Sequence, residues 1–420
     1  MKAKRSLAPV PPVGVQPWDG RLHDVAGFRT ASLHCGLKTA KEEPPDLALL
    51  YCQVAAAAAG VFTQNRICAA PVTVSREHLK ASKRRARALI INAGNANACT
   101  GEQGMADARQ MAQLTADGLK CSPDEVLVMS TGIIGHKLPM DKVSAGIERA
   151  VGFVSEQDNT GDFARGIMTT DLAPKTAGVE LGVNRKTIRI SGACKGSGMI
   201  APNMATMLGV VVTDAAVAPV VLQKALSDVA SETFNCVTVD GDTSTNDSLV
   251  LLASGLAENK PVTSASGAAY EAFREGLFKV CDSLARQIAA DGEGAKHTVT
   301  LYVGGTRNDA DARMIARTIA ESPLVKTAIA GNDPNWGRIM AAAGRAGVAF
   351  DPQEAVLTVC GHELFRAGQP VEFDKQMVAT ALKTRDVNIV LLLGDGPGRA
   401  KFYTCDLTHG YITINADYHT

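Results

Sequence analysis

The sequence predicts an α/β protein with two domains or lobes, and three observations support this. Short apolar or β-branched runs typical of strands alternate along the chain with segments of helical periodicity. The chain has 420 residues, which is more than a single compact core usually contains. Hydrophobic residues make up 46% of the chain and there are 39 glycines, a composition that favours a loop-rich globular enzyme over a disordered chain.

Six runs predict strands, and three segments predict helices between them. The strand-like runs are Ala88–Asn92, Val126–Ser130, Leu208–Thr213, Thr298–Val303, Ile389–Leu393 and Tyr411–Asn415. The clearest helix has apolar residues at spacings of three and four, namely Tyr270, Phe273, Leu277, Cys281, Leu284 and Ile288. A second helix is predicted to begin at Pro219 and to turn Leu222, Leu226 and Val229 inward; a third contains Met314, Ile315 and Ile319.

The composition argues against several classes of protein. The formal net charge is zero, whereas nucleic-acid binders usually carry a basic excess. The ten cysteines form no C-x-x-C pair, so we expect free thiols in a reducing cytoplasm. The longest nearly apolar stretch, Leu47–Phe62, is interrupted by Gln53 and is too short to span a membrane. The basic, Pro-rich segment Met1–Trp18 lacks the apolar region of a secretory signal. We therefore expect a cytoplasmic protein without nucleic-acid or membrane partners.

Two familiar ligand-binding patterns fail on inspection. The glycines of residues 196–198 are followed by Ala201 where a dinucleotide-binding loop requires glycine. The segment Asp240–Asp247 resembles a calcium loop, but Thr245 occupies the glycine position and Leu251 the position of the bidentate glutamate. We therefore expect neither a bound metal nor a resident cofactor.

A threonine lies where a Gly- and Pro-rich loop meets a predicted strand. The loop Lys195–Thr206 leads directly into the apolar run Leu208–Thr213. A threonine hydroxyl becomes an effective nucleophile when the residue's own α-amino group, with a pKa near ~8, acts as the general base. Thr206 acquires that amine only if the Ala205–Thr206 bond is cut. This chemistry does not select Thr206 over other threonines, and a threonine packed at a strand start is the alternative.

A resemblance makes the selection. The run Lys195-Gly-Ser-Gly-Met-Ile-Ala-Pro-Asn-Met-Ala-Thr-Met-Leu-Gly209 resembles the cleavage-site signature of the ornithine acetyltransferase family, also called the ArgJ or arginine biosynthesis bifunctional protein family. Similar segments follow in family order over residues 25–420. They are Asp46–Leu50, Ala59–Arg66, Asn92–Ala98, Ser130–Gly135, Met168–Asp171, Asp240–Asp247, Asp291–Ala295, Gly331–Arg338 and Asn415–Thr420.

The resemblance implies a fold, a maturation step and an activity. The fold is a self-cleaving, Ntn-like sandwich of stacked sheets flanked by helices, of the DmpA and ArgJ type, with a smaller C-terminal lobe from about residue 298. Self-cleavage gives an α chain, 1–205, and a β chain, 206–420, which assemble as a heterotetramer of two α and two β chains. The implied enzyme is a glutamate N-acetyltransferase of arginine biosynthesis. It carries acetyl from N2-acetylornithine to glutamate on Thr206. Use of acetyl-CoA as a second acetyl donor stays open.

The resemblance also implies site residues. Thr131 and Gly132 stabilise the oxyanion of the tetrahedral intermediate. We assign Lys195 to a substrate carboxylate and Glu293 to the terminal ammonium of ornithine. The relative roles of Thr169 and Thr170 stay open. The full substrate-binding set implied is Thr169, Lys195, Thr206, Glu293, Asn415 and Thr420.

Two other functions compete with this prediction. A self-processing aminopeptidase or amidase of a related fold would use the same kind of nucleophile but pass the acyl group to water. A non-catalytic binding protein would stay as one uncleaved chain of 44.0 kDa.

Overall fold

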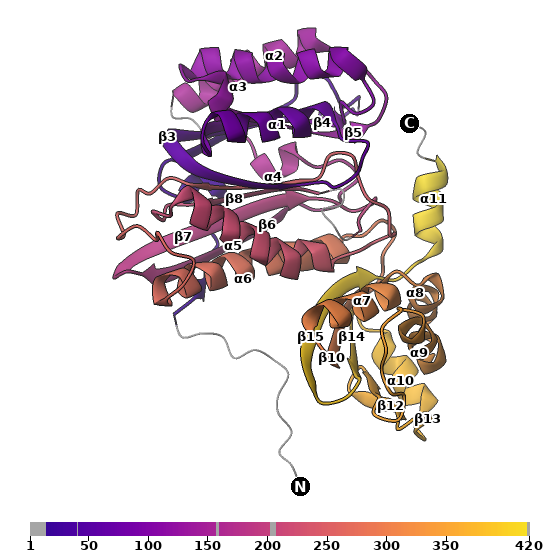
Figure 1. The fold of residues 1–420 in the computed structure, drawn as a ribbon. Coiled ribbons are helices and arrows are strands. Elements are labelled where there is room, and N and C mark those ends of the chain that lie inside the picture. The colour runs from indigo at the N-terminus through magenta and orange to yellow at the C-terminus, as the bar shows by residue number, and fades with distance from the viewer. Residues whose placement is uncertain (1–13, 40, 157–158, 202–206, 418–420) are drawn as a thin grey trace.

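The computed structural model describes residues 14–39, 41–156, 159–201 and 207–417 (Figure 1). Three predicted site residues, Ala205, Thr206 and Thr420, lie outside these ranges. The described residues form a nine-stranded sheet and a separate six-stranded sheet.

The larger sheet has the strand order β1-β6-β7-β8-β9-β3-β4-β5, and β2 pairs with β3. Its strands are β1 (Gln16–Pro17), β2 (Phe28–Leu33), β3 (Leu47–Phe62), β4 (Arg85–Asn95), β5 (Val126–Ile133), β6 (Lys175–Val183), β7 (Lys186–Lys195), β8 (Leu208–Thr213) and β9 (Ser248–Ala253). The long strand β3 joins two halves, because its beginning pairs with β4 and its end pairs with β9.

The two halves of this sheet stack face to face. Leu89 and Ile91 of β4 share one buried core with Val210 and Val212 of β8. Neighbouring side chains point the other way, since side chains of a strand alternate between its two faces. Ile90, for example, packs in a different core. The alternation therefore gives the central strands, such as β8 and β9, an inner and an outer apolar face, which explains their nearly continuous apolar runs.

Helices cover both outer faces of the sandwich. The half built on β3, β4 and β5 packs against α1 (Ala70–Ala81), α2 (Gly101–Leu119) and α3 (Met140–Ser155). The other half packs against α5 (Pro219–Glu232) and α6 (Ala268–Ala290), and Figure 1 shows these two helix layers on opposite sides. Shorter pieces are α4 (Phe163–Gly166), η1 (Leu22–Asp24), η2 (Pro123–Glu125) and η3 (Phe234–Cys236).

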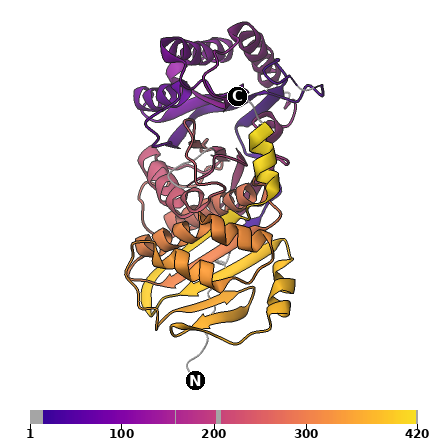
Figure 2. The same ribbon diagram turned by 90° about the vertical axis from the view of Figure 1, so that its right-hand side faces the viewer.

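A smaller C-terminal lobe has its own sheet and core (Figure 2). Its strands are β10 (Thr298–Gly305), β11 (Val356–Val359), β12 (His362–Arg366), β13 (Gln369–Pro370), β14 (Asp386–Leu392) and β15 (Gly396–Cys405). The helices α7 (Asp309–Ala320), α8 (Pro323–Ala330), α9 (Trp336–Gly344) and α10 (Lys375–Leu382) contribute to this core. The predicted fold class, a helix-flanked sandwich of stacked sheets with a smaller C-terminal lobe, is confirmed.

Most predicted elements are confirmed, and one is wrong. Five of the six predicted strand runs lie in or overlap β4, β5, β8, β10 and β14, and the three predicted helices are α5, α6 and α7. The segment Tyr411–Asn415 is not a strand but part of α11 (His409–Asp417). A strand needs a neighbouring strand for its backbone hydrogen bonds, whereas a helix satisfies them internally. The helix leaves the C-terminal lobe and extends beside the sandwich (Figures 1 and 2), so it does not pair with a strand at the edge of a sheet.

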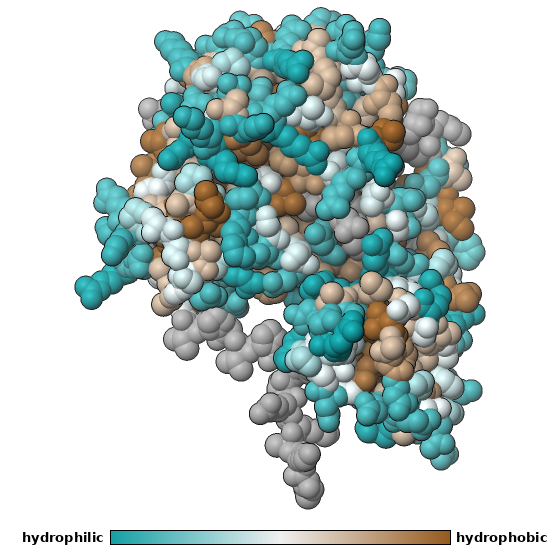
Figure 3. Space-filling model, viewed as in Figure 1, coloured by the Kyte–Doolittle hydropathy of each residue, from teal (hydrophilic) through white to brown (hydrophobic). Residues whose placement is uncertain are grey.

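The surface and the cysteines add two plain findings. In the described part of the chain, none of the helices has the length and apolar character that crossing a membrane requires. The face in Figure 3 is mostly hydrophilic, with small hydrophobic patches scattered over it. All ten cysteines lie within the described ranges and are free thiols.

Candidate active site

Several strand ends meet where the loop before β8 joins the sandwich. Lys195, the last residue of β7, pairs with Leu208, the first residue of β8. Leu208 pairs in turn with Ser248 at the start of β9. The far end of β3, Phe62, pairs with Ser248 from the other side. The residue that follows the predicted nucleophile, Met207, is therefore held at an edge where three neighbouring strands begin or end.

Met207 is fixed by the segment before β9. Its backbone N–H donates to Asp247 Oδ1 at 2.9 Å. Its carbonyl oxygen accepts from the Ser248 N–H at 3.0 Å. These two hydrogen bonds set the position of the chain one residue after the predicted nucleophile.

The same segment connects to the predicted oxyanion residues. Thr131 is 4% exposed and lies with Gly132 near the end of β5. The Asn246 amide donates to the Ser130 carbonyl oxygen at 2.8 Å and to the Ala96 carbonyl oxygen at 2.6 Å. Thr131 is therefore one residue from a hydrogen bond that joins β5 to the segment holding Met207.

Gly132 occupies a position that only glycine fits. Its φ is +132°, in a region that side chains disfavour. A Cβ there would lie 2.2 Å from the Gly94 carbonyl carbon and 2.5 Å from the Asn95 nitrogen. The close approach coincides with a register shift between β4 and β5, so the glycine shapes the backbone at the predicted oxyanion site.

On the other side of the site, the buried carboxylate of Asp171 lies among the predicted residues. Asp171 accepts hydrogen bonds from the Thr169 N–H at 3.0 Å and the Gly196 N–H at 2.6 Å. Lys175 Nζ lies 2.6 Å from Asp171 Oδ1 and 2.6 Å from Asp291 Oδ2. Burial raises the pKa of Asp171, but Lys195 and Lys175 outweigh it and bring that pKa down to about 2. The carboxylate is therefore charged and fixes the start of the loop.

The side chain of Lys195 is buried, and its charge has little direct compensation from a neighbouring carboxylate. It is 3% exposed, and the nearest carboxylate oxygen among the described residues, Asp171 Oδ2, is 3.9 Å from its Nζ. Burial lowers its pKa, while Asp171, Glu293 and Asp247 act in the opposite direction. An ammonium at this depth that donates no hydrogen bond to the described residues is suited to hold an anionic group of a substrate.

Glu293 and Asn415 meet beside the loop. The Asn415 amide donates to Glu293 Oε2 at 2.9 Å, and the Glu293 N–H donates to the Ser197 carbonyl oxygen at 2.9 Å. Ser197 Oγ also lies 2.9 Å from the Thr170 hydroxyl. A side chain at Gly198 would place its Cβ 2.4 Å from the Glu293 carboxyl carbon. The carboxylate of Glu293 is therefore packed directly against the loop.

The structure thus brings four predicted substrate residues together and leaves two outside its described part. Thr169 and Lys195 gather at Asp171, and Glu293 and Asn415 gather at Ser197, only two residues along the chain from Lys195. Thr131 and Gly132 connect through Asn246 and Asp247 to Met207. Thr206 and Thr420 cannot be added to this geometry, because they lie outside the described residues.

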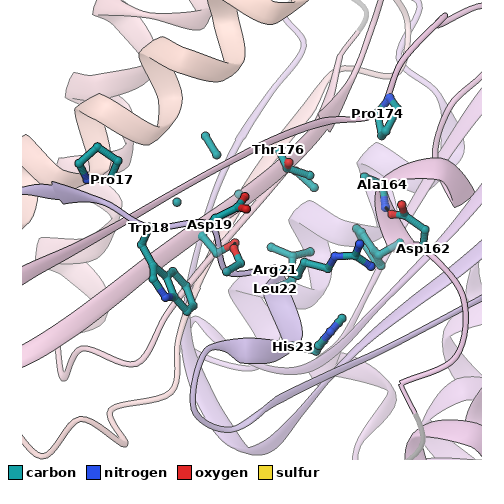
Figure 4. A pocket seen from close by; sticks show the side chains of 17 residues that line it. Pro17, Trp18, Asp19, Arg21, Leu22, His23, Asp162, Ala164, Pro174 and Thr176 are labelled. Atoms are coloured by element: carbon teal, nitrogen blue, oxygen red, sulfur yellow. Dashed lines mark hydrogen bonds between the residues drawn. The ribbon is translucent and has the colours of Figure 1, made fainter.

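A separate cavity of about 490 Å³ lies elsewhere in the sandwich. Figure 4 shows Trp18, Arg21 and His23 of the N-terminal segment lining it together with Asp162 and Thr176. None of the predicted site residues within the described ranges lines this cavity.

Sequence reasoning missed the charged residues that organise the site. Asp171, Lys175 and Asp291 form a buried network, and Asp247 holds Met207. Asp171, Asp291 and Asp247 each lie in a segment with family-like sequence, which was the available signal. The segment Asp240–Asp247, which resembles a calcium loop in sequence, has a structural role. Asp240 accepts the backbone N–H groups of residues 199 and 200 at 2.6 and 2.9 Å, and no group of three or more His, Cys, Asp or Glu suited to a metal exists among the described residues.

Comparison with known proteins agrees with the resemblance noted in the sequence. The model of the ArgJ family matches residues 29–420. The chain belongs to the ArgJ family. Among ArgJ relatives, the arginine biosynthesis bifunctional protein ArgJ of Dehalococcoides mccartyi is 46% identical over 403 residues, covering 96% of this chain and 98% of the relative. The protein of the same name from Synechocystis sp. is 45% identical over 412 residues, covering 96% and 98%.

Two solved structures of similar sequence each align with about half of the chain. The arginine biosynthesis bifunctional protein of Bacillus halodurans is 42% identical with a TM-score of 0.48, covering 49% of this chain and 96% of the solved chain. The ornithine acetyltransferase of Mycobacterium tuberculosis, solved with ornithine, is 34% identical with a TM-score of 0.39, covering 46% of this chain and 100% of the solved chain.

Proposed function

We propose that the protein is a glutamate N-acetyltransferase of arginine biosynthesis that moves acetyl from N2-acetylornithine to glutamate. The observation that carries this proposal is the family match along residues 29–420, together with relatives named arginine biosynthesis bifunctional proteins over nearly their full length. The positions of Thr131, Lys195 and Glu293 around the loop that ends at Met207 support it.

The proposed maturation step makes the nucleophile. The Thr206 hydroxyl oxygen attacks the Ala205 carbonyl carbon, and the peptide C–N bond breaks as an ester forms. The break of the C–N bond releases the Thr206 α-amine, and water then hydrolyses the ester, which frees the Ala205 carboxylate and restores the Thr206 hydroxyl. The amine can thereafter act as the general base for its own hydroxyl.

The proposed transfer has two matching half-reactions. Thr206 Oγ attacks the acetyl carbonyl of N2-acetylornithine, and the hydroxyl proton passes through the α-amine to the departing ornithine nitrogen as the C–N bond breaks. The unprotonated amine of glutamate then attacks the acetyl ester, and Thr206 Oγ leaves and recovers a proton. In both steps the oxyanion would accept hydrogen bonds from the Thr131 hydroxyl and the Gly132 N–H.

The charges around the loop suit the two substrates. N2-acetylornithine and glutamate both carry an α-carboxylate, for which the buried Lys195 ammonium is a partner. Glu293 suits the terminal ammonium that only the ornithine compound carries, and Asn415 orients its carboxylate. Thr169 and the terminal Thr420 would complete the substrate contacts. We further propose a cytoplasmic heterotetramer of two α and two β chains.

The test is an acetyl-transfer assay with two donors. Purified protein is incubated with N2-acetylornithine labelled in its acetyl group, with and without glutamate, and the products are separated. We expect labelled N-acetylglutamate with glutamate present and little free acetate. Free acetate formed regardless of glutamate would identify an amidase instead. A parallel assay with acetyl-CoA decides whether the protein also uses this second donor.

A further inference from the structure

A basic groove lies on the flank of the sandwich, where β3 contacts both α1 and α5 (Figure 1). It has a volume of about 570 Å³ and shares no lining residue with the cavity of Figure 4. Arg76 and Lys80 of α1 line it, together with Lys83 and Arg84 of the turn that follows. Its size falls within the range of pockets that bind small molecules, roughly 300–1,000 Å³.

The four cations of this groove have no acidic partner. None of them forms an ion pair within the described ranges, and no carboxylate from those ranges lines the groove. The neighbouring acidic residue of α1, Glu77, pairs instead with Arg109 at 3.2 Å. By contrast, the cavity of Figure 4 contains the carboxylates of Asp19 and Asp162 beside the cation of Arg21. In a chain with equal numbers of basic and acidic residues, the groove is a local excess of positive charge that attracts anions.

Two of the cations are guanidinium groups that are already held in place. Arg84 Nη1 donates to Gln223 Oε1 at 2.6 Å, and the Gln223 amide exchanges two hydrogen bonds of 3.1 Å with the backbone of Gly60. Arg76 Nη2 donates to the Thr63 carbonyl oxygen at 2.5 Å. A guanidinium has five N–H donors, so each keeps donors for a further acceptor. Guanidinium groups fixed in this way suit the oxygens of a phosphate.

The turn after α1 has an unusual backbone for two residues with long side chains. The φ angles of Lys83 and Arg84 are +55° and +61°, in the left-handed region that residues other than glycine disfavour. Glycine is the usual residue just after the end of a helix. Strained backbone of this kind concentrates at functional sites. The two cationic side chains, both at the groove, are a reason for these residues to replace glycine in the turn.

Apolar side chains line the rest of the groove, and they include Phe62, Leu79, Pro219 and Val220. Val220 is 76% exposed although it is a large hydrophobic residue. Phe62 is half-buried, and its ring centroid lies 5.5 Å from the guanidinium carbon of Arg76. An inorganic anion uses only the cations, whereas a ligand with an apolar or aromatic part also covers these side chains. We propose that the groove binds an organic polyphosphate, with its phosphates on the four cations and its apolar or aromatic part against Phe62 and Val220.

Two kinds of organic polyphosphate have this chemistry. One is acetyl-CoA, the second acetyl donor considered above, and the other is a free nucleotide such as ATP. Phe62 pairs with Ser248, which pairs with Leu208, so Phe62 and Leu208 are two strand spacings apart, about 10 Å. This nearness to the candidate active site suits acetyl-CoA, whose thioester lies at the opposite end of the molecule from its phosphates. A role for the groove in acetyl donation rests on the proposed function, whereas binding of the phosphates does not.

The first test is isothermal titration calorimetry with coenzyme A, ATP and inorganic pyrophosphate at about 0.15 M ionic strength, where weak surface electrostatics are screened. The native protein is compared with the double variant Lys80→Gln/Lys83→Gln. The matched control is Lys120→Gln/Lys383→Gln, because both of its lysines are exposed and neither lines the groove. The two double variants change the net charge equally.

We expect the native protein to bind at least one of the two organic ligands more tightly than pyrophosphate. The groove variant should weaken this binding about tenfold, since it removes two exposed charges that contribute about threefold each. The control should bind as the native protein does. Tighter binding of coenzyme A than of ATP identifies the ligand as the second acetyl donor, and the reverse order identifies a free nucleotide.

Three results overturn the proposal. The first is that neither organic ligand binds at millimolar concentration. The second is equal affinity of the groove variant and the native protein, which places the ligand elsewhere. The third is pyrophosphate binding as tight as that of the organic ligands, which indicates an adventitious ion only. Transfer from N2-acetylornithine to glutamate is assayed separately, so none of these results refutes the proposed function.

A single variant separates binding from folding. Lys83→Gly removes one groove cation and places glycine at the φ of +55°, where glycine is favoured. Its midpoint of urea unfolding should therefore equal or exceed that of the native protein, while its affinity for the organic ligand falls about threefold. A Lys83→Gly protein that is at least as stable as the native protein and binds the ligand equally tightly would contradict the placement of the phosphates.

Discussion

Replacing Asp171 by asparagine should destabilise the sandwich and disorganise the loop at the site. The Asp171 side chain is fully buried, bonds Lys175 Nζ at 2.6 Å, and lies 3.9 Å from Lys195 Nζ. Its pKa is about 2 instead of 3.8, a difference of about two units that corresponds to about 2.5 kcal/mol of stability. Removing one partner of a buried ion pair costs about 3–5 kcal/mol. Because Lys175 keeps Asp291 at 2.6 Å, we expect the lower end, about 3 kcal/mol.

The assay is urea unfolding in a Trp336→Phe background, so that Trp18 in the sandwich is the remaining indole of the two in the chain. Glu77→Gln is the control, because Glu77 pairs with Arg109 at 3.2 Å on the exposed surface and such pairs contribute about 0–1 kcal/mol. A loss of less than about 1 kcal/mol for Asp171→Asn, equal to that of the control, would refute the reasoning.

The same carboxylate predicts a direction for pH dependence. A depressed pKa in the folded state means that the carboxylate stabilises the fold above its unfolded value, 3.8, and loses this contribution as the pH falls towards about 2. Asp171→Asn should therefore flatten the acid side of the stability curve in this window.

Two further substitutions test the site. Glu293→Gln should raise the KM for N2-acetylornithine about tenfold, since a charge-assisted hydrogen bond contributes about 1.5–3 kcal/mol. The KM for glutamate should change little. Steady-state kinetics that show an unchanged KM for the donor would count against the assignment of Glu293 to the ornithine ammonium. Gly132→Ala would place a Cβ 2.2 Å from the Gly94 carbonyl carbon. It should slow acetylation of the mature enzyme about 100-fold or more, as measured in single-turnover experiments. Acetylation at the normal rate would contradict a role of Gly132 in stabilising the oxyanion.

The repeating apolar pattern of the sequence predicted strands and helices well, because that pattern directly reflects burial. The run Leu208–Thr213 matches β8 at both ends, and both faces of this strand are buried, so each of its residues is constrained. The stripe from Tyr270 to Ile288 lies within α6 for the same reason. The segment Tyr411–Asn415 carried an equally strand-like pattern, but most of its residues are exposed, so no packing constraint supported the prediction.

Only those site residues that belong to local sequence motifs could be predicted from the sequence. Lys195 and Thr131 belong to recognisable segments, whereas the bond between Lys175 and Asp291 joins residues 116 apart in the sequence. Asp247 binds the Met207 N–H from a position 40 residues further along the chain. Such information arises only when strands β8 and β9 are placed side by side.

The central claim is that the chain cuts itself before Thr206 and uses that residue as its nucleophile. Intact mass spectrometry of the purified native protein and of Thr206→Ala tests it most directly. We expect two chains of roughly half the 44.0 kDa mass for the native protein, the second beginning at Thr206, and a single whole chain for the variant. A native protein that remains whole yet transfers acetyl to glutamate would contradict the account.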